Sequence, residues 1–185
     1  MHGMLNDYVL RFTCSLLINK QQESYRYVIH EIKVAYRNLT GNDLNPTAIV
    51  IDFEAALKQA IVLELPGSVI YGCFFHYCKA IWRHVQEEGL QQPYQIDIHV
   101  HSIIRSIMAL AFVPINFVRL SYQNVRQDPV TLQKIQQYPG LAVLFHYFEN
   151  QWLRADGVFP PITWNVYERP MEFRTNNYVE SFDNR

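Results

Sequence analysis

The stretch Thr47-Ala-Ile-Val-Ile-Asp52-Phe-Glu-Ala-Ala-Leu57 places a carboxylate directly after a short apolar run. Residues 48–51 are apolar on both faces, which is typical of a buried strand in a parallel sheet. A helical pattern begins immediately after Asp52. Because open α/β sheets place their chemistry at the carboxyl ends of strands, Asp52 is the first candidate for a functional residue. The plainer alternative is that Asp52 only caps the following helix.

Composition limits the classes of protein that this chain can belong to. It has 185 residues, of which 49% are apolar and 18% charged, and this balance predicts a globular domain with a sizeable core. The formal net charge of -1 argues against DNA binding through bulk charge, so any DNA contact is expected from local patches or from segments outside this chain. Three cysteines argue against a disulfide framework. We expect an intracellular protein without a membrane span, in the nucleus rather than the cytoplasm.

Apolar periodicity and turn residues predict an α/β fold followed by a helical region. The expected strands and helices, in chain order, are a hairpin turn before a strand over 11–18, a helix over 22–39, the strand over 48–51, a helix over 53–65, a strand over 68–73, and a helix over 74–88. Further helices are expected over 98–112, 116–126, 130–137 and 139–152, with an irregular proline-rich loop over 157–172 and a helix start after 174. The order predicts a mixed sheet with an antiparallel start and a parallel finish.

Several short pieces resemble, in order, the transposase domain of Mutator-like elements (MULEs). The three main pieces are Ile51-Asp52-Phe53-Glu54-Ala55-Ala56, then Gly72-Cys73-Phe74-Phe75-His76 with Trp82, then Arg174-Thr175-Asn176-Asn177-Tyr178-Val179-Glu180. Two more are Phe112-Val113-Pro114 and Trp164-Asn165-Val166-Tyr167-Glu168-Arg169. No single motif is specific, but the set in this order is, and it extends over nearly the whole chain.

The resemblance implies a fold and a chemistry. The fold is ribonuclease H-like, with an all-helical insertion before the last catalytic helix. The expected domains are a core over 1–90 that lacks its first strand, an insertion and loop over 91–173, and the start of the final helix over 174–185. The family's DDE triad of two Asp and one Glu holds two Mg²⁺ or Mn²⁺ ions, which activate the attacking oxygen and stabilise the leaving one during DNA cleavage and strand transfer.

By this resemblance Asp52 matches the second acid and Glu180 the third, and both are expected metal ligands. The first acid is expected upstream of the hairpin, and Asp7, in the hairpin turn, is a poor substitute. An incomplete triad should bind metal weakly, so this chain alone is expected to be a poor nuclease. Two hypotheses follow. In the first, the chain is a fragment of a transposase catalytic domain whose partner is the DNA of transposon ends. In the second, it is a co-opted module that binds DNA or protein without catalysis. A third, less favoured hypothesis is an unrelated nuclease with a ribonuclease H-like sheet. The sequence does not decide whether the chain forms homo-oligomers.

Cys73 and His76 correspond to the Cys-x-x-His motif of the resembling family. One interpretation is structural, with Cys73 packed as a small apolar residue and His76 bonded in the core. A second is a role close to DNA. A third is half of a zinc site, but no second pair with a standard spacing accompanies it. The resemblance identifies the pair without fixing its chemistry.

A further group of side chains has the chemistry to contact DNA. It consists of Lys79, Arg83, Asn176, Asn177, Trp82 and Trp164. The two cations share a helix face with His76 and could meet phosphates, or the face could simply be solvated. The two asparagines could orient Glu180 or contact DNA, or one could cap a helix. The two tryptophans could stack on an unpaired base, although a place in the core is the plainer interpretation.

Overall fold

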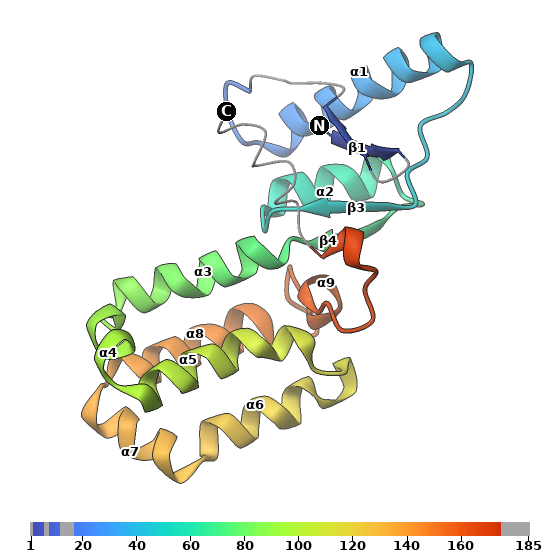
Figure 1. Ribbon diagram of the computed structural model, residues 1–185. Helices are drawn as coiled ribbons and strands as arrows, with labels where there is room; N and C mark the ends of the chain where they lie inside the picture. Colours follow the sequence, from blue (N-terminus) through green and yellow to red (C-terminus); the bar gives the residue numbers. More distant parts are fainter. Residues whose placement is uncertain (1, 6–7, 12–16, 175–185) are drawn as a thin grey trace. The chain divides into compact units, whose positions relative to one another are not determined.

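The computed structural model describes residues 2–5, 8–11 and 17–174 of the chain (Figure 1). These residues belong to two compact units. We call the described residues up to Tyr71 the N-terminal unit and Gly72–Arg174 the helical unit. The predicted division into 1–90, 91–173 and 174–185 stays a prediction. None of the described helices is long and apolar enough to cross a bilayer.

The N-terminal unit begins with a hairpin. Strands β1 (His2–Leu5) and β2 (Tyr8–Arg11) pair antiparallel, from His2 opposite Arg11 to Leu5 opposite Tyr8. This register confirms the predicted hairpin around Asn6 and Asp7, although these two residues lie outside the described ones. The strand that follows the turn begins earlier than the predicted start at residue 11, because pairing starts at Tyr8, and most of the predicted range 11–18 lies outside the described residues.

The rest of the N-terminal unit alternates helices and strands. Its elements are α1 (Gln22–Thr40), β3 (Ala48–Ile51), α2 (Ala55–Glu64) and β4 (Val69–Gly72), whose last residue already belongs to the helical unit. Helix α1 ends at Gly41, which has φ 73° and donates to the Arg37 carbonyl, as its sequence predicts. Helix α1 packs on α2, where Arg26 and Lys33 both contact Glu64.

The class α/β is confirmed, but the predicted single mixed sheet is not. Among the described residues, β1 pairs with β2, and β3 pairs in parallel with β4, so there are two separate two-stranded sheets and the fold is mostly helical. The ribonuclease H-like topology therefore stays a prediction.

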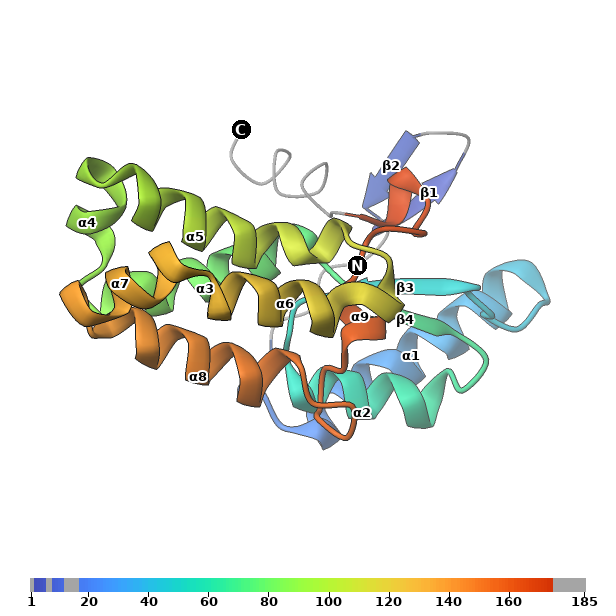
Figure 2. The same ribbon diagram turned by 90° about the horizontal axis from the view of Figure 1, so that it is seen from below.

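The helical unit consists of short helices around one core. Its helices are α3 (Phe74–Glu87), α4 (Gln91–Ile96), α5 (Ile98–Ala109), α6 (Val118–Gln127), α7 (Pro129–Gln137), α8 (Gly140–Trp152) and α9 (Pro161–Trp164), with 3₁₀ turns η1 (Leu110–Phe112), η2 (Ile115–Phe117) and η3 (Met171–Phe173). Figures 1 and 2 show α3, α5, α6 and α8 running alongside one another. The predicted helical region is confirmed. The predicted irregular loop over 157–172 contains α9 and the start of η3.

Apolar residues at helical spacing build this core. The fully buried positions include Tyr77, Ile81 and Val85 on α3, Val100, Ile104 and Ile107 on α5, and Leu141, Leu144, Phe145 and Phe148 on α8. The helices also approach closely at the start of α8, because a Cβ on Gly140 would lie 2.6 Å from the carbonyl oxygen of Glu88. A glycine is therefore needed where α8 passes the end of α3.

Asp97 caps the start of α5, and its contacts should make the stability of the protein depend on pH. Its side chain accepts from the backbone N–H groups of His99 and Val100, and the Nζ of Lys134 lies 2.6 Å from its Oδ2. The bond from Lys134 is the main cause that lowers the pKa of Asp97. A carboxyl whose pKa is lowered by folding stabilises the protein above its unfolded pKa of about 3.9, and this contribution is lost as the pH falls through the folded pKa.

We therefore expect Asp97→Ala to lower the melting temperature of the chain at pH 7. The difference from wild type should shrink as the pH is lowered from 5 through the acidic range, since the wild-type carboxyl becomes protonated. Thermal unfolding monitored by circular dichroism at a series of pH values measures this difference. A difference that stays constant down to pH 2 would contradict the role given to the Lys134 contact.

Candidate functional site

Asp52 lies where the sequence analysis expected it, directly after the carboxyl end of β3. The last residue of the strand, Ile51, is buried, whereas Asp52 is exposed. The Glu54 backbone N–H donates to the Asp52 carbonyl at 2.7 Å and closes a tight turn before α2. Helix α2 begins at Ala55, so Glu54 occupies its N-cap position. The interpretation of Asp52 as the helix cap is therefore wrong, because the turn moves the cap two residues further along.

A tyrosine of α1 contacts this turn. The Tyr25 hydroxyl donates to Glu54 Oε1 at 2.7 Å, and Lys20 Nζ lies 3.6 Å from Glu54 Oε2. Burial, the bond to Glu54 and the negative charges of Glu54 and Asp52 raise the pKa of Tyr25 to about 12. The phenol thus stays protonated at neutral pH and holds Glu54 in place, while Asp52 lies within electrostatic range of the same phenol. No role was predicted for Tyr25, which lies outside the resembling pieces, or for Glu54, which lies inside the first of them.

Cys73 and His76 lie where β4 leads into α3. Cys73 is fully buried and occupies the N-cap position of α3, and its carbonyl accepts from the Tyr77 N–H at 3.0 Å. His76 is half-buried, and the Phe75 ring meets it edge-on at 5.4 Å. The burial of Cys73 agrees with the packing interpretation. The described residues contain no group of three or more His, Cys, Asp or Glu side chains that could hold a metal.

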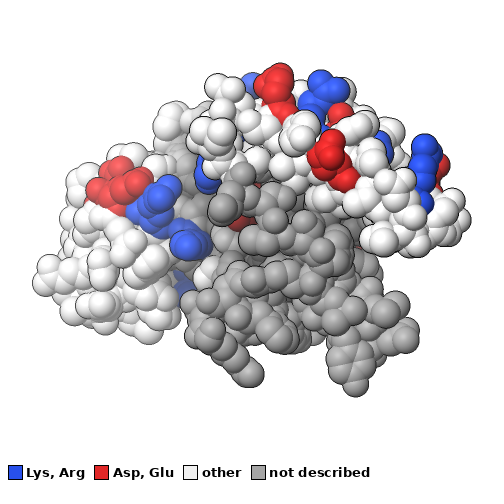
Figure 3. Space-filling view, turned by 90° about the horizontal axis from the view of Figure 1, so that it is seen from above, with Lys and Arg blue, Asp and Glu red and all other residues white. Residues whose placement is uncertain are grey.

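Lys79 and Arg83 lie on the exposed side of α3, and Lys79 Nζ lies 5.9 Å from the centroid of the Phe75 ring. Figure 3 shows basic and acidic side chains mixed over the described part of one face, without a broad basic area. This mixture agrees with the formal net charge of -1. A role of the two cations in DNA binding remains a prediction.

Glu180, Asn176, Asn177 and Asp7 lie outside the described residues. The residue that precedes this final segment, Arg174, is well anchored within the helical unit. Its carbonyl accepts from the Phe74 N–H at 2.9 Å, next to the end of β4.

Arg169 holds the loop before Arg174 together. Only 3% of Arg169 is exposed. Its Nη1 donates to the carbonyls of Gly72 (2.6 Å) and Phe173 (3.2 Å), and its Nη2 donates to those of Thr163 (2.8 Å) and Asn165 (2.9 Å). The Arg169 carbonyl in turn accepts from Arg174 Nε at 3.0 Å. In the sequence, Arg169 is only the last residue of the piece Trp164–Arg169 that resembles the MULE family. Its burial could not be predicted, because a single buried arginine does not appear in the apolar periodicity.

A family model described as the MULE transposase domain matches residues 4–80. The match begins at Met4, within β1, includes β2, Asp52, Cys73, His76 and Lys79, and ends within α3. Comparisons with curated proteins and with solved structures gave no match. The matched segment therefore contains the first piece of the resemblance and the second piece as far as His76, but neither Trp82 nor the third piece, which contains Glu180.

Proposed function

We propose, because a family model described as the MULE transposase domain matches residues 4–80, that this chain is part of a DDE-type transposase that acts on the DNA of transposon ends. The observation that carries the proposal is the exposed carboxylate of Asp52, directly after the buried end of β3 and inside the matched segment. In this proposal Asp52 is the second acid of the triad and Glu180 the third. The partner is DNA, and the place of action is the nucleus.

One carboxylate at the end of β3, that of Asp52, has the chemistry to bind a hard divalent cation, although the described residues contain no group of three such ligands. Asp52 offers carboxylate oxygens at an exposed position, and these are the donors that Mg²⁺ and Mn²⁺ prefer. Two such ions supply activation of the attacking oxygen and stabilisation of the leaving one. The chain's own contribution is to present the Asp52 carboxylate on a short rigid turn. Tyr25 and Lys20 hold the neighbouring Glu54 and keep that turn ordered.

We expect Asp52→Asn to weaken Mn²⁺ binding by about tenfold or more, because an amide lacks the charge that holds the ion. Mn²⁺ titration followed by electron paramagnetic resonance measures this on the full chain. Asp43→Asn is the matched control, since Asp43 is an exposed acid of the same unit that pairs with Arg37. The control should bind Mn²⁺ like the wild type.

Equal Mn²⁺ affinity of the wild type and Asp52→Asn would refute the metal-binding role of Asp52. If the chain nevertheless bound DNA without any effect of Mn²⁺, the alternative of a co-opted, non-catalytic binding module would take its place. Cleavage of a duplex that carries the transposon end, assayed with Mg²⁺ or Mn²⁺, provides the second readout for the proposal.

A further inference from the structure

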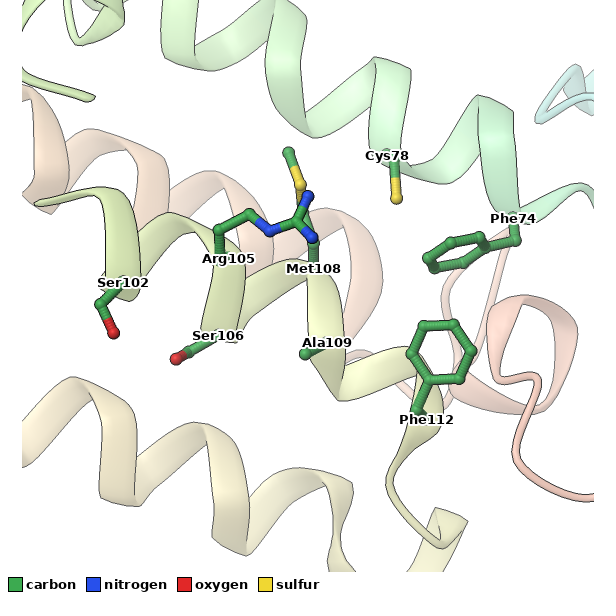
Figure 4. A pocket seen from close by; sticks show the side chains of 8 residues that line it. All are labelled: Phe74, Cys78, Ser102, Arg105, Ser106, Met108, Ala109 and Phe112. Carbon is green, nitrogen blue, oxygen red and sulfur yellow. The ribbon is translucent and has the colours of Figure 1, made fainter. Parts of the chain in front are cut away.

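A pocket of about 480 Å³ lies within the helical unit, between α3, α5 and η1. Its walls include Phe74 and Cys78 of α3, Arg105 of α5 and Phe112 of η1. Figure 4 shows the two phenyl rings next to each other at one end of the pocket and the Arg105 side chain extending from α5 toward α3, on the side where Cys78 lies. The volume falls within the range of about 300 to 1,000 Å³ that is usual for small-molecule sites.

The aromatic end of the pocket offers a stacking surface. The ring centroids of Phe74 and Phe112 lie 4.8 Å apart in an edge-to-face arrangement. Phe112 is 45% exposed, whereas the large aromatic residues of the core are fully buried. An aromatic ring that contacts one neighbour and remains partly exposed can stack on a flat apolar group, and every nucleobase has such a face.

The other end of the pocket carries positive charge. Arg105 is exposed, and among the described residues it is the only charged one that lines the pocket. Within the part of the chain that the structure describes, no carboxylate pairs with its guanidinium. Burial raises the pKa of the Cys78 thiol to about 11 despite the opposing influence of Arg105, so the thiol is neutral at pH 7. The pocket is therefore cationic and suits an anion.

We propose that this pocket binds one unpaired nucleotide of a DNA strand, with its base against Phe112 and its phosphate on the Arg105 guanidinium. An aromatic face next to an unpaired cation is the combination by which proteins hold single-stranded nucleic acid. The inference rests on the proposed function, since the choice of DNA over another aromatic anion follows from it. It extends the DNA contact from the matched segment to the helical unit.

The test is the affinity of the full chain for a single-stranded oligodeoxynucleotide, measured by fluorescence anisotropy. Arg105→Gln and Phe112→Ala should each weaken binding by about tenfold, as loss of one stacked base or phosphate contact does. Phe112→Tyr should bind like the wild type, because it keeps the ring. The matched controls are Arg154→Gln and Phe117→Ala, an exposed arginine paired with Asp156 and an exposed phenylalanine of η2, and both should stay within about twofold of wild type.

Unchanged affinity of Arg105→Gln and Phe112→Ala would overturn the inference, and so would a wild type that binds duplex DNA but no single strand. Neither result touches the proposed function, which is judged by the effect of Asp52→Asn on Mn²⁺ binding and by duplex cleavage. Two further binding measurements, with free deoxynucleoside monophosphates and with an RNA strand, test whether the bound nucleotide belongs to a DNA strand. Equal affinity for free deoxynucleoside monophosphates, or tighter binding of an RNA strand of the same sequence, would also refute the assignment to DNA.

Discussion

Replacement of Arg169 by methionine is expected to lower the free energy of unfolding of the helical unit by about 3 kcal/mol or more. Arg169 is 3% exposed and its guanidinium donates to four backbone carbonyls in two buried and two part-buried bonds, so its loss leaves these acceptors without their charged donor. Urea unfolding followed by tryptophan fluorescence measures the effect. All three tryptophans, Trp82, Trp152 and Trp164, lie in the helical unit.

Two further variants separate this role from a general loss of charge. Arg119→Met removes an exposed arginine that donates to the Leu153 carbonyl at 2.9 Å, and it should cost about 1 kcal/mol or less. Arg169→Lys keeps the charge but cannot reproduce the planar fork of donors, so it should fall between wild type and Arg169→Met. A stability of Arg169→Met within about 0.5 kcal/mol of wild type would show that the four bonds contribute little.

The contacts of Arg169 also show why part of the fold could not be predicted. Helix α1 was predicted over 22–39 and observed as Gln22–Thr40, because its apolar spacing and Gly41 act locally. The bond from Arg169 to Gly72 joins residues 97 positions apart, and no local sequence pattern predicts it. The same holds for α9, a single turn inside a proline-rich segment, whose buried Trp164 anchors it to the core.

In the candidate site, too, local features could be predicted from the sequence and long-range contacts could not. The position of Asp52 could be predicted, because a buried apolar strand and the carboxylate after it are adjacent in the sequence. The helix cap was misplaced, since the pattern cannot show that a two-residue turn separates Asp52 from Ala55. The contact of Tyr25 with Glu54 joins two elements 29 positions apart and depends on how α1 packs. Periodicity gives the face of α1 and not the partner of each side chain.

Trp164→Ala should destabilise the helical unit by about 3 to 5 kcal/mol, the usual cost of deleting a large buried aromatic side chain. Trp164 is 0% exposed, its indole Nε1–H donates to the Trp152 carbonyl at 2.9 Å, and its ring stacks on Tyr77 with centroids 5.0 Å apart. The sequence alone left open whether this tryptophan stacks on a base, and its burial places it in the core instead.

The distinction between Trp164 and Phe112 can be measured. Urea unfolding followed by far-ultraviolet circular dichroism gives the stability of each variant, and oligodeoxynucleotide titration gives the affinity of its folded fraction. Trp164→Ala should lower the stability and leave the affinity for the oligodeoxynucleotide unaltered. Phe112→Ala should lower this affinity and leave the stability nearly unaltered, because Phe112 is 45% exposed and contributes less to the core. Trp164→Phe, which keeps a ring but loses the bond to Trp152, should lie between wild type and Trp164→Ala in stability. If Trp164→Ala kept its stability but lost DNA affinity, the assignment of this side chain to the core would be wrong.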